Sequence, residues 1–459
     1  MTLSRREFGR LLGGAGMLSA VGQLGRAAMA SASDGTYRAM VGVFLVGGND
    51  GFNTIVPTDS RYRAYAQARA GIALPESSLL PLTGTGFGLH PALSPLKPIW
   101  DAGAMSAVLN VGSLFMPMDK ATYLSRPDYR PLNLMSHADE QQHWQGLRMR
   151  DFNADGFMGR LTDRVPVTTV PSAMSIAGSN LAVMGVQTSP LVLAPGGSMG
   201  RNGWTPGATD GAIKTRQAAV GVFANGSGAG TVTNMTGQEI NSAYVQSDAV
   251  NGLLNATSPV DAYFVDPVTK APLQSAIAKQ LQRCARMIAD RASLGQNRQC
   301  FFTTHSGFDN HIGQVIVANP TAGTHANLLN TLAVACAAFY NCMKGLGLTN
   351  NVTLFTMSDF GRTLKPNGQA GTDHAWGSNH FVIGGGLKPK TVYGRYPDVT
   401  LGGPEDAMAE GRFIPSIAIE EYLSPIAQWH GVAPADMPYV FPNWSTWNGG
   451  GRGPVPMFA

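Results

Sequence analysis

The sequence predicts an α/β fold with a mostly parallel central sheet flanked by helices. Short apolar runs such as residues 40–46 are typical of strands buried on both faces of a parallel sheet. Between them lie segments such as residues 324–344, whose apolar residues recur at helical spacing. Strands that alternate with helices in this way favour βαβ connections and therefore parallel strands.

The predicted elements follow one another along most of the chain. The predicted strands are 40–46, 104–111, 300–304, 352–357 and 381–383. The predicted helices are 61–69, 90–100 with prolines inside, 137–148, 156–164, 272–291, 324–344 and 417–430. We see no internal repeat. We therefore expect residues 31–459 to form a single large α/β domain.

Residues 195–258 have a different character from the rest of the chain. They are rich in Gly, Ser, Asn and Thr and poor in aliphatic residues. Such a composition favours surface structure over core. We expect this segment to be a surface insertion or part of a cap.

The N-terminus has the order of a twin-arginine export signal. Arg5 and Arg6 are followed by Phe8, and a weakly apolar run occupies residues 11–24. That run is shorter than the ~20 apolar residues of a spanning helix. A small-x-small cleavage site follows at residues 28–30. Residues 1–30 therefore predict export through the twin-arginine translocon, without a stable membrane span, to the periplasm or beyond.

The charge balance argues against nucleic-acid binding. The formal net charge is +4, and removal of the signal with its four arginines and one glutamate lowers it to +1. Nucleic-acid-binding proteins carry clusters of basic residues, which this balance does not suggest.

The four cysteines leave two alternatives open. Cys284 and Cys300 flank a predicted helix-to-strand connection and could pair in an oxidising compartment, whereas Cys336 and Cys342 lie on one predicted helix. No CxxC metal pair is present. The expectation is either buried thiols that act as small hydrophobic residues or one disulfide.

Carboxylates and imidazoles follow several of the predicted strands. In an open α/β sheet, ligands bind beyond the carboxyl ends of the strands. Convergence of such loops predicts a divalent metal site, and we expect Zn, Mn or Ca. An Asp after a strand can also be a helix N-cap, and a His can simply be a hydrogen-bonded loop residue. The residues in these loops are Asp50, His305, Asp309, His311, Asp359, Asp373, His374 and His380, with His137 opening a helix after another loop.

Ser136 and Arg362 each have two interpretations. Ser136 precedes a predicted helix, so it is a candidate N-cap and also a candidate nucleophile at a positive helix end. A neighbouring metal ion would activate its hydroxyl group. Arg362 is a candidate anion clamp, because guanidinium binds phosphate or sulfate in bidentate fashion, or else a partner in a structural salt bridge.

Seven motifs in a fixed order resemble the family known as domain of unknown function 1501. They are GGNDGFN at 47–53, FGLHPAL at 87–93, Ser136-His137 followed by Trp144, GFMGR at 156–160, GFDNH at 307–311, SDFGRT at 358–363 and GTDH at 371–374. The fold of that family resembles the alkaline phosphatase and sulfatase superfamily. That superfamily cleaves phosphate or sulfate esters with one or two divalent metals and a Ser, Thr or formylglycine nucleophile.

The resemblance implies roles for particular residues. It implies metal ligation by Asp50, Asp309, His311, Asp359, Asp373 and His374, and catalytic roles for Ser136, Arg362 and His137. The sequence departs from the superfamily in its Asp-His pair, which is Asp359-Phe360 here, in the narrow spacing of Asp309 and His311, and in an Asp at 359 where Glu is more usual. One metal, or a site completed by Asp373 or His137, fits this set.

The predicted activity is metal-dependent hydrolysis of a phosphate or sulfate ester outside the cytoplasm. The surviving Asp and His residues favour this activity. The alternative is a non-catalytic binding or assembly protein on a degenerate scaffold, which Phe360 favours.

Overall fold

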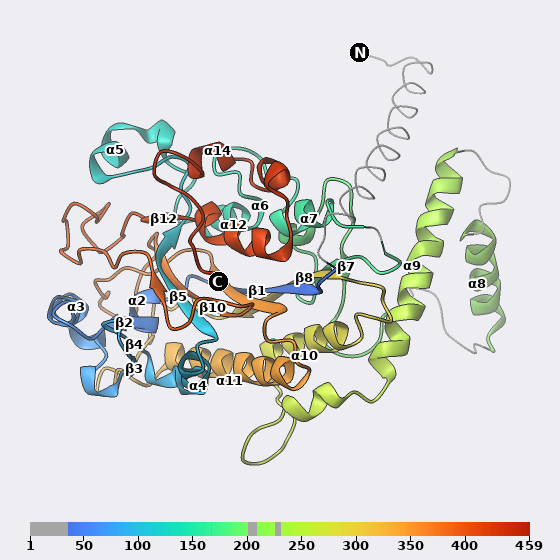
Figure 1. Ribbon diagram of the computed structural model, residues 1–459, viewed down its shortest axis with the longest axis horizontal. Helices are drawn as coiled ribbons and strands as arrows, with labels where there is room; N and C mark the ends of the chain where they lie inside the picture. The colour runs from blue at the N-terminus through green and yellow to red at the C-terminus, as the bar shows by residue number, and fades with distance from the viewer. Residues whose placement is uncertain (1–34, 167, 201–208, 225–230) are drawn as a thin grey trace.

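The computed structural model of the protein describes residues 35–166, 168–200, 209–224 and 231–459. Within these residues a nine-stranded sheet forms the centre, and helices cover both of its faces (Figure 1). The strand order is β11-β5-β10-β9-β1-β8-β6-β7, with β12 paired to β5. The predicted signal, residues 1–30, lies outside the described residues, so export stays a prediction.

The sheet is parallel except at one strand. The central strands β9, β1 and β8 are parallel neighbours, and Leu45 of β1 pairs with both His305 and Ser358. Within the large sheet as described, only β10 runs antiparallel to its neighbours, β5 and β9. The large sheet consists of β1 Arg38–Val46, β5 Met105–Gly112, β6 Ala173–Ser175, β7 Leu191–Val192, β8 Arg298–Ser306, β9 Val352–Ser358, β10 Ser378–Gly384, β11 Val392–Tyr393 and β12 Ile417–Ala418; a small sheet consists of β2 Ile55–Pro57, β3 Leu80–Leu82 and β4 Phe87–Leu89. The predicted fold class is confirmed.

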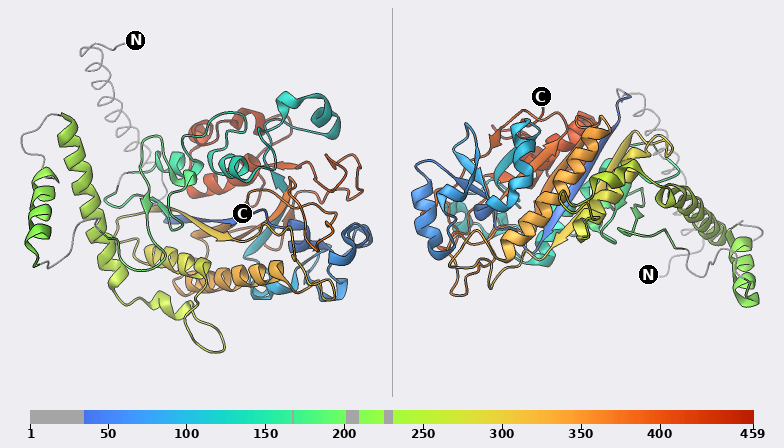
Figure 2. Two further views of the ribbon diagram at one scale, coloured as in Figure 1. Left: turned by 180° about the vertical axis from the view of Figure 1, so that it is seen from behind. Right: turned by 90° about the horizontal axis from the view of Figure 1, so that it is seen from below.

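The helices form a layer on each side of the sheet. In Figures 1 and 2, α10 and α11 lie on one side, and α6, α7 and α12 lie on the other. The helices are α2 Gly51–Thr54, α3 Tyr62–Arg69, α4 Lys97–Asp101, α5 Lys120–Ser125, α6 His137–Gly146, α7 Phe157–Thr162, α8 Gly211–Ala224, α9 Thr231–Asn255, α10 Ala276–Ala289, α11 Thr324–Gly345, α12 Ile419–His430, α13 Met437–Val440 and α14 Trp444–Trp447. The predicted helix 90–100 is a 3-10 helix, Pro91–Leu96, that continues into α4.

The alternation of side chains along β1 explains its unbroken apolar run. Val41 and Val43 belong to the core cluster on the side of α10 and α11, whereas Met40 and Phe44 belong to the cluster on the side of α12. Successive side chains of a strand point to opposite faces, so a strand covered on both faces must be apolar at every position.

Helix α11 is the one described helix that is long and apolar enough to cross a bilayer by length and composition. It packs against α10 and the Pro91–Leu96 segment, and 56% of its apolar window is buried inside the protein. A core helix of a soluble domain passes the same test, and the packing of α11 is that of a core helix.

The segment 195–258 contains two helices that its composition did not predict. Helices α8 and α9 pack against each other and project from the body (Figures 1 and 2). Only the end of α9 reaches the core, where Val250 and Leu254 are buried. The sparse aliphatic residues follow from this arrangement, because most of the hairpin contacts only itself.

All four cysteines are buried free thiols, so the disulfide alternative is wrong. Burial raises the pKa of Cys284, Cys300, Cys336 and Cys342, and the thiolate is the reactive form. We therefore expect the folded protein to react slowly with a thiol reagent, and the unfolded protein to show four thiols without reduction. Fast reaction of the native protein, or fewer than four thiols after unfolding, would contradict this.

Candidate metal centre

Three loops that leave the parallel strands β1, β8 and β9 meet at one edge of the sheet. The backbone N–H of Phe308, after β8, donates to the carbonyl of Val46 at 3.1 Å. The backbone N–H of Gly47, after β1, donates to the Asp359 carboxylate at 3.2 Å. Gly47 has φ +114°, and a Cβ there would lie 2.4 Å from the Asp309 nitrogen. Only glycine permits this approach.

A fourth loop, which carries Asp373 and His374, packs beside the three loops that follow β1, β8 and β9. Arg362 and His374 form an isolated antiparallel bridge, and the Thr363 N–H donates to the Asp373 carbonyl at 2.9 Å. Gly371 lies so close to the preceding loop that a Cβ would be 2.0 Å from the His311 carbonyl oxygen. These contacts bring His311 and His374 to one place.

Three imidazoles and one guanidinium surround the Asp309 carboxylate. Its Oδ1 lies 3.0 Å from His311 Nε2, 3.3 Å from His374 Nε2 and 2.7 Å from Arg362 Nη2. Its Oδ2 lies 3.5 Å from His137 Nε2. His137, Asp309 and His374 form a group that could hold a metal ion, with donor atoms within 4.8 Å of one another. His311 Nε2 lies 3.0 Å from His374 Nε2.

The Nδ1 atom of each imidazole is hydrogen-bonded to an oxygen acceptor. His137 Nδ1 donates to Asp359 at 2.6 Å, His311 Nδ1 to Asp373 at 2.8 Å, and His374 Nδ1 to the Met135 carbonyl at 2.9 Å. In a neutral ring this places the hydrogen on Nδ1 and leaves a lone pair on Nε2. Metal-binding histidines are oriented in the same way, by carboxylates or carbonyls behind the ring.

The charge state of the centre also suits a cation. Burial opposes ionisation of Asp309, but the hydrogen bond and charge of Arg362 outweigh it and lower the pKa. Burial likewise opposes ionisation of Asp373, and hydrogen bonds from His311 and Asn367 lower its pKa. Burial lowers the pKa of His374 and so favours its neutral form. Ionised carboxylates and neutral imidazoles are the forms that bind metals.

The residues present fit a divalent ion. His137 Nε2 is buried and has no hydrogen-bond partner. The carboxyl groups of Asp309, Asp359 and Asp373 each contact an imidazole of the cluster, and the Arg362 guanidinium pairs with Asp309. The imidazole nitrogens of His137 and His374 and the carboxylate oxygen of Asp309 are ligand types that zinc favours.

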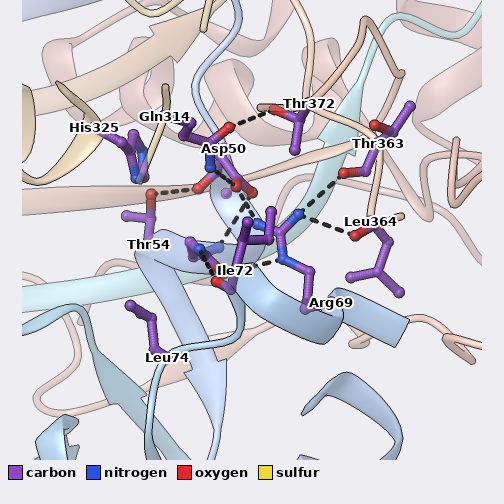
Figure 3. A network of polar contacts seen from close by, with 12 residues as sticks. Asp50, Thr54, Arg69, Ile72, Leu74, Gln314, His325, Thr363, Leu364 and Thr372 are labelled. Atoms are coloured by element: carbon purple, nitrogen blue, oxygen red, sulfur yellow. Dashed lines mark hydrogen bonds and ion pairs between the residues drawn. The ribbon is translucent and has the colours of Figure 1, made fainter. Parts of the chain in front are cut away.

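Of the predicted metal ligands, Asp309, His311 and His374 meet in this cluster. Asp359 and Asp373 contact the Nδ1 atoms of histidines, so they lie behind the candidate ligands. Asp50 lies outside the cluster. Its carboxylate is paired with Arg69 and accepts a hydrogen bond from Gln314 Nε2 at 2.5 Å (Figure 3).

The predicted catalytic residues all lie in or beside the cluster. His137 joins the candidate ligands. Arg362 is fully buried and ion-paired with Asp309, which is its salt-bridge interpretation, and its Nε and Nη1 have no partner. Ser136 stands at the N-cap position of α6, but its hydroxyl does not cap the helix. It donates to Asp139 Oδ2 at 2.6 Å.

Phe360 occupies a place where the resemblance led us to expect an imidazole. Its ring centroid lies 4.8 Å from that of His137 and 4.5 Å from that of His374. The imidazole beside Asp359 comes instead from His137 of α6. The two remaining histidines of the predicted loops lie elsewhere: His305 bonds the Leu328 carbonyl, and His380 is buried within β10.

The sequence analysis missed several partners of the cluster. Gln141 Nε2 donates to Asp359 at 3.1 Å, and its position four residues after His137 puts both on one face of α6. Helical spacing could therefore have identified Gln141. The Met135 carbonyl faces His374 from a residue with φ +68°, and nothing in the sequence signals that conformation.

Comparisons with known proteins find one family and distant structures. None of the curated proteins searched matches the sequence. The chain is similar to the structure of Ps i-CgsB in complex with k-i-k-neocarrahexaose, at 11% identity and TM-score 0.35 over 88% of this chain and 74% of that one. It is also similar to the phosphonate monoester hydrolase SpPMH from Silicibacter pomeroyi, at 9% identity and TM-score 0.29 over 77% and 70%. Similarity at this level does not bear on activity.

The family model described as "Protein of unknown function (DUF1501)" matches residues 238–414. The matched range contains Asp309, His311, Asp359, Arg362 and His374 of the cluster, whereas His137 lies before it.

Proposed function

We propose that the chain is an exported, metal-dependent hydrolase of phosphate or sulfate esters, whose ion is held by His137, Asp309, His311 and His374. The observation that carries the proposal is the set of three imidazoles whose Nδ1 atoms are each bound to an oxygen acceptor while their Nε2 atoms face one carboxylate. A divalent ion bound there supplies a Lewis acid for an ester oxygen.

The residues around the ligands hold them in place. Asp359 and Asp373 fix the ring orientation and tautomer of His137 and His311, and such partners raise the basicity of the ligating nitrogen. Arg362 holds Asp309 through a 2.7 Å contact and offsets part of the negative charge of the centre. The fully buried guanidinium of Arg362 therefore acts on Asp309 rather than on substrate.

Ser136 is the proposed nucleophile. It lies between Met135, whose carbonyl bonds His374, and His137, so both of its neighbours contact the cluster. Hydrogen bonds from Asn133 and Ser136 hold the pKa of Asp139 below its usual value, so Asp139 stays a carboxylate that orients the Ser136 hydroxyl. In the reaction, Ser136 Oγ bonds to phosphorus or sulfur as the bond to the ester oxygen breaks, and the hydroxyl proton passes through Asp139, which accepts it at 2.6 Å, to the departing alcohol. Water then displaces phosphate or sulfate from Ser136 and restores its hydroxyl.

A second candidate function is non-catalytic binding or assembly on the same scaffold. Two observations favour it. Phe360 packs against two of the imidazoles, and the Ser136 hydroxyl is bonded to Asp139 rather than to a member of the cluster.

Turnover of model esters by a Ser136→Ala variant separates the two candidates. We expect the metal-loaded mature protein to hydrolyse an aryl phosphate or aryl sulfate. We expect Ser136→Ala to lower kcat at least about 100-fold, because the covalent step is lost, and to keep its metal. The control is Ser125→Ala, whose hydroxyl bonds only the Ala121 carbonyl in exposed helix α5.

The two failures have different meanings. Unchanged turnover in Ser136→Ala would show that Ser136 is not the nucleophile. No hydrolysis of either ester class by the metal-loaded wild type would favour the non-catalytic candidate.

A further inference from the structure

The buried polar network shown in Figure 3 connects residues of the loops that carry the cluster. Asp50 and Arg69 are ion-paired there, with 1% and 0% of their side chains exposed. Two further members, Gln314 and Thr372, are completely buried. We call these four residues the loop clasp. None of them belongs to the candidate ligands of the ion.

The loop clasp contacts each of the four loops of the metal centre. Asp50 itself lies in the loop after β1. Arg69 Nη1 donates to the carbonyls of Thr363 and Leu364, at 3.0 and 3.1 Å, in the loop that begins at Asp359. Arg69 reaches these carbonyls from the end of α3, more than 290 positions earlier in the chain.

The other two loops are joined through side chains. Gln314, three residues after His311, donates through Nε2 to the Asp50 carboxylate at 2.5 Å. Its Oε1 accepts the Thr372 hydroxyl at 2.5 Å, and Thr372 lies two residues before His374. A single chain of contacts therefore runs from Arg69 through Asp50 and Gln314 to the loop of His374.

Both partners of the buried pair are charged. Burial opposes the charge of Asp50, but Arg69 outweighs it and lowers the pKa of Asp50. Burial also opposes the charge of Arg69, and Asp50 outweighs it and raises the pKa of Arg69. A buried ion pair is often no more stabilising than apolar residues of similar volume. Stability alone therefore does not account for a charged pair at this junction.

We propose that the Asp50–Arg69 pair positions the metal centre, by fixing the loops that carry His311, Arg362 and His374 relative to one another. The pair acts through these residues and touches neither ion nor substrate. This inference rests on the proposed metal site and adds to it the residues that set the ligand geometry.

Cobalt binding by a double variant, Asp50→Asn with Arg69→Met, tests the proposal on the full mature chain. The asparagine keeps an acceptor for the Asn53 N–H at the start of α2, and the double change leaves no unpaired buried charge. We expect Co²⁺ to bind about 10- to 100-fold more weakly, as after loss of other outer-sphere partners. We also expect the visible absorption spectrum of bound Co²⁺, which reports ligand geometry, to shift.

The matched control is another Arg–Asp pair with a buried arginine, changed as Asp155→Asn with Arg160→Met. Arg160 is equally buried and bonds Asp155 and the carbonyls of Gly146 and Val440, away from the four loops. We expect this control to bind Co²⁺ with wild-type affinity and spectrum, even where thermal unfolding of the metal-free protein shows a similar loss of stability.

Each outcome decides one claim. A folded Asp50→Asn, Arg69→Met protein with wild-type Co²⁺ affinity and spectrum would overturn the positioning role and leave the metal site intact. Wild-type protein that binds no Co²⁺ would overturn the metal site and this inference with it. If the double variant does not fold, Thr372→Val removes only the hydroxyl bond to Gln314, and a wild-type Co²⁺ spectrum in that variant would overturn the claim that the pair fixes the loop of His374.

Discussion

The double variant Asp309→Asn, His374→Ala is expected to lose its metal. The wild type should carry about one divalent ion per chain, and the variant less than about a tenth of that, because two of the four proposed ligands are gone. Asp309 is the carboxylate that all three Nε2 atoms face. Its side chain is 47% exposed, so the loss of metal should come without unfolding. Elemental mass spectrometry of the purified mature protein, with thermal unfolding alongside, checks both points.

The control is a histidine outside the cluster. His305→Gln is suitable, because the His305 ring bonds only the Leu328 carbonyl and a glutamine amide can donate the same hydrogen bond. Its metal content should equal that of the wild type. Equal metal in the double variant and the wild type would place the ion elsewhere in the protein.

Gly47→Ala is expected to be strongly destabilising, because it combines backbone strain with a steric clash. The alanine would adopt φ +114° and put its Cβ 2.4 Å from the Asp309 nitrogen. Backbone strain costs about 1–3 kcal/mol, and overpacking costs about as much again. We therefore expect a loss of about 2–6 kcal/mol in the free energy of unfolding, measured by urea denaturation.

Gly178→Ala is the control, because it introduces backbone strain without a steric clash. Gly178 has φ +78°, and a Cβ there would meet nothing within 4 Å. It should therefore lose about 1 kcal/mol from the backbone alone. Equal losses in the two variants would mean that the close approach of Gly47 to the Asp309 loop has no energetic consequence.

The parallel sheet could be predicted because a strand that is buried on both faces must have an unbroken apolar sequence. Met40 to Val46 must be apolar throughout to fill the two cores that β1 separates, and the apolar runs of β8 and β9 carry the same signal. Helices α8 and α9 could not be predicted in this way. They contact mainly each other and bury little, so no apolar periodicity distinguishes them from loops.

The site was predictable to the extent that it depends on topology. Residues that follow parallel strands must gather at one edge, which brought Asp309 and Asp359 together. The role of Asp50 was not predictable, because its partner Arg69 lies on a helix whose sequence gives no sign that the arginine is buried. The role of His137 depends on α6 placing its first residue against Asp359, a tertiary contact without a local signal.

X-ray absorption at the metal edge of the purified protein tests the central claim most directly. The claim is that His137, His311 and His374, with Asp309, hold one divalent ion. The predicted spectrum shows about three imidazole nitrogens and an oxygen, at ~2.0–2.2 Å if the ion is zinc. A metal-loaded protein whose spectrum contains no imidazole scattering, or a protein that takes up no divalent metal at all, would contradict the account.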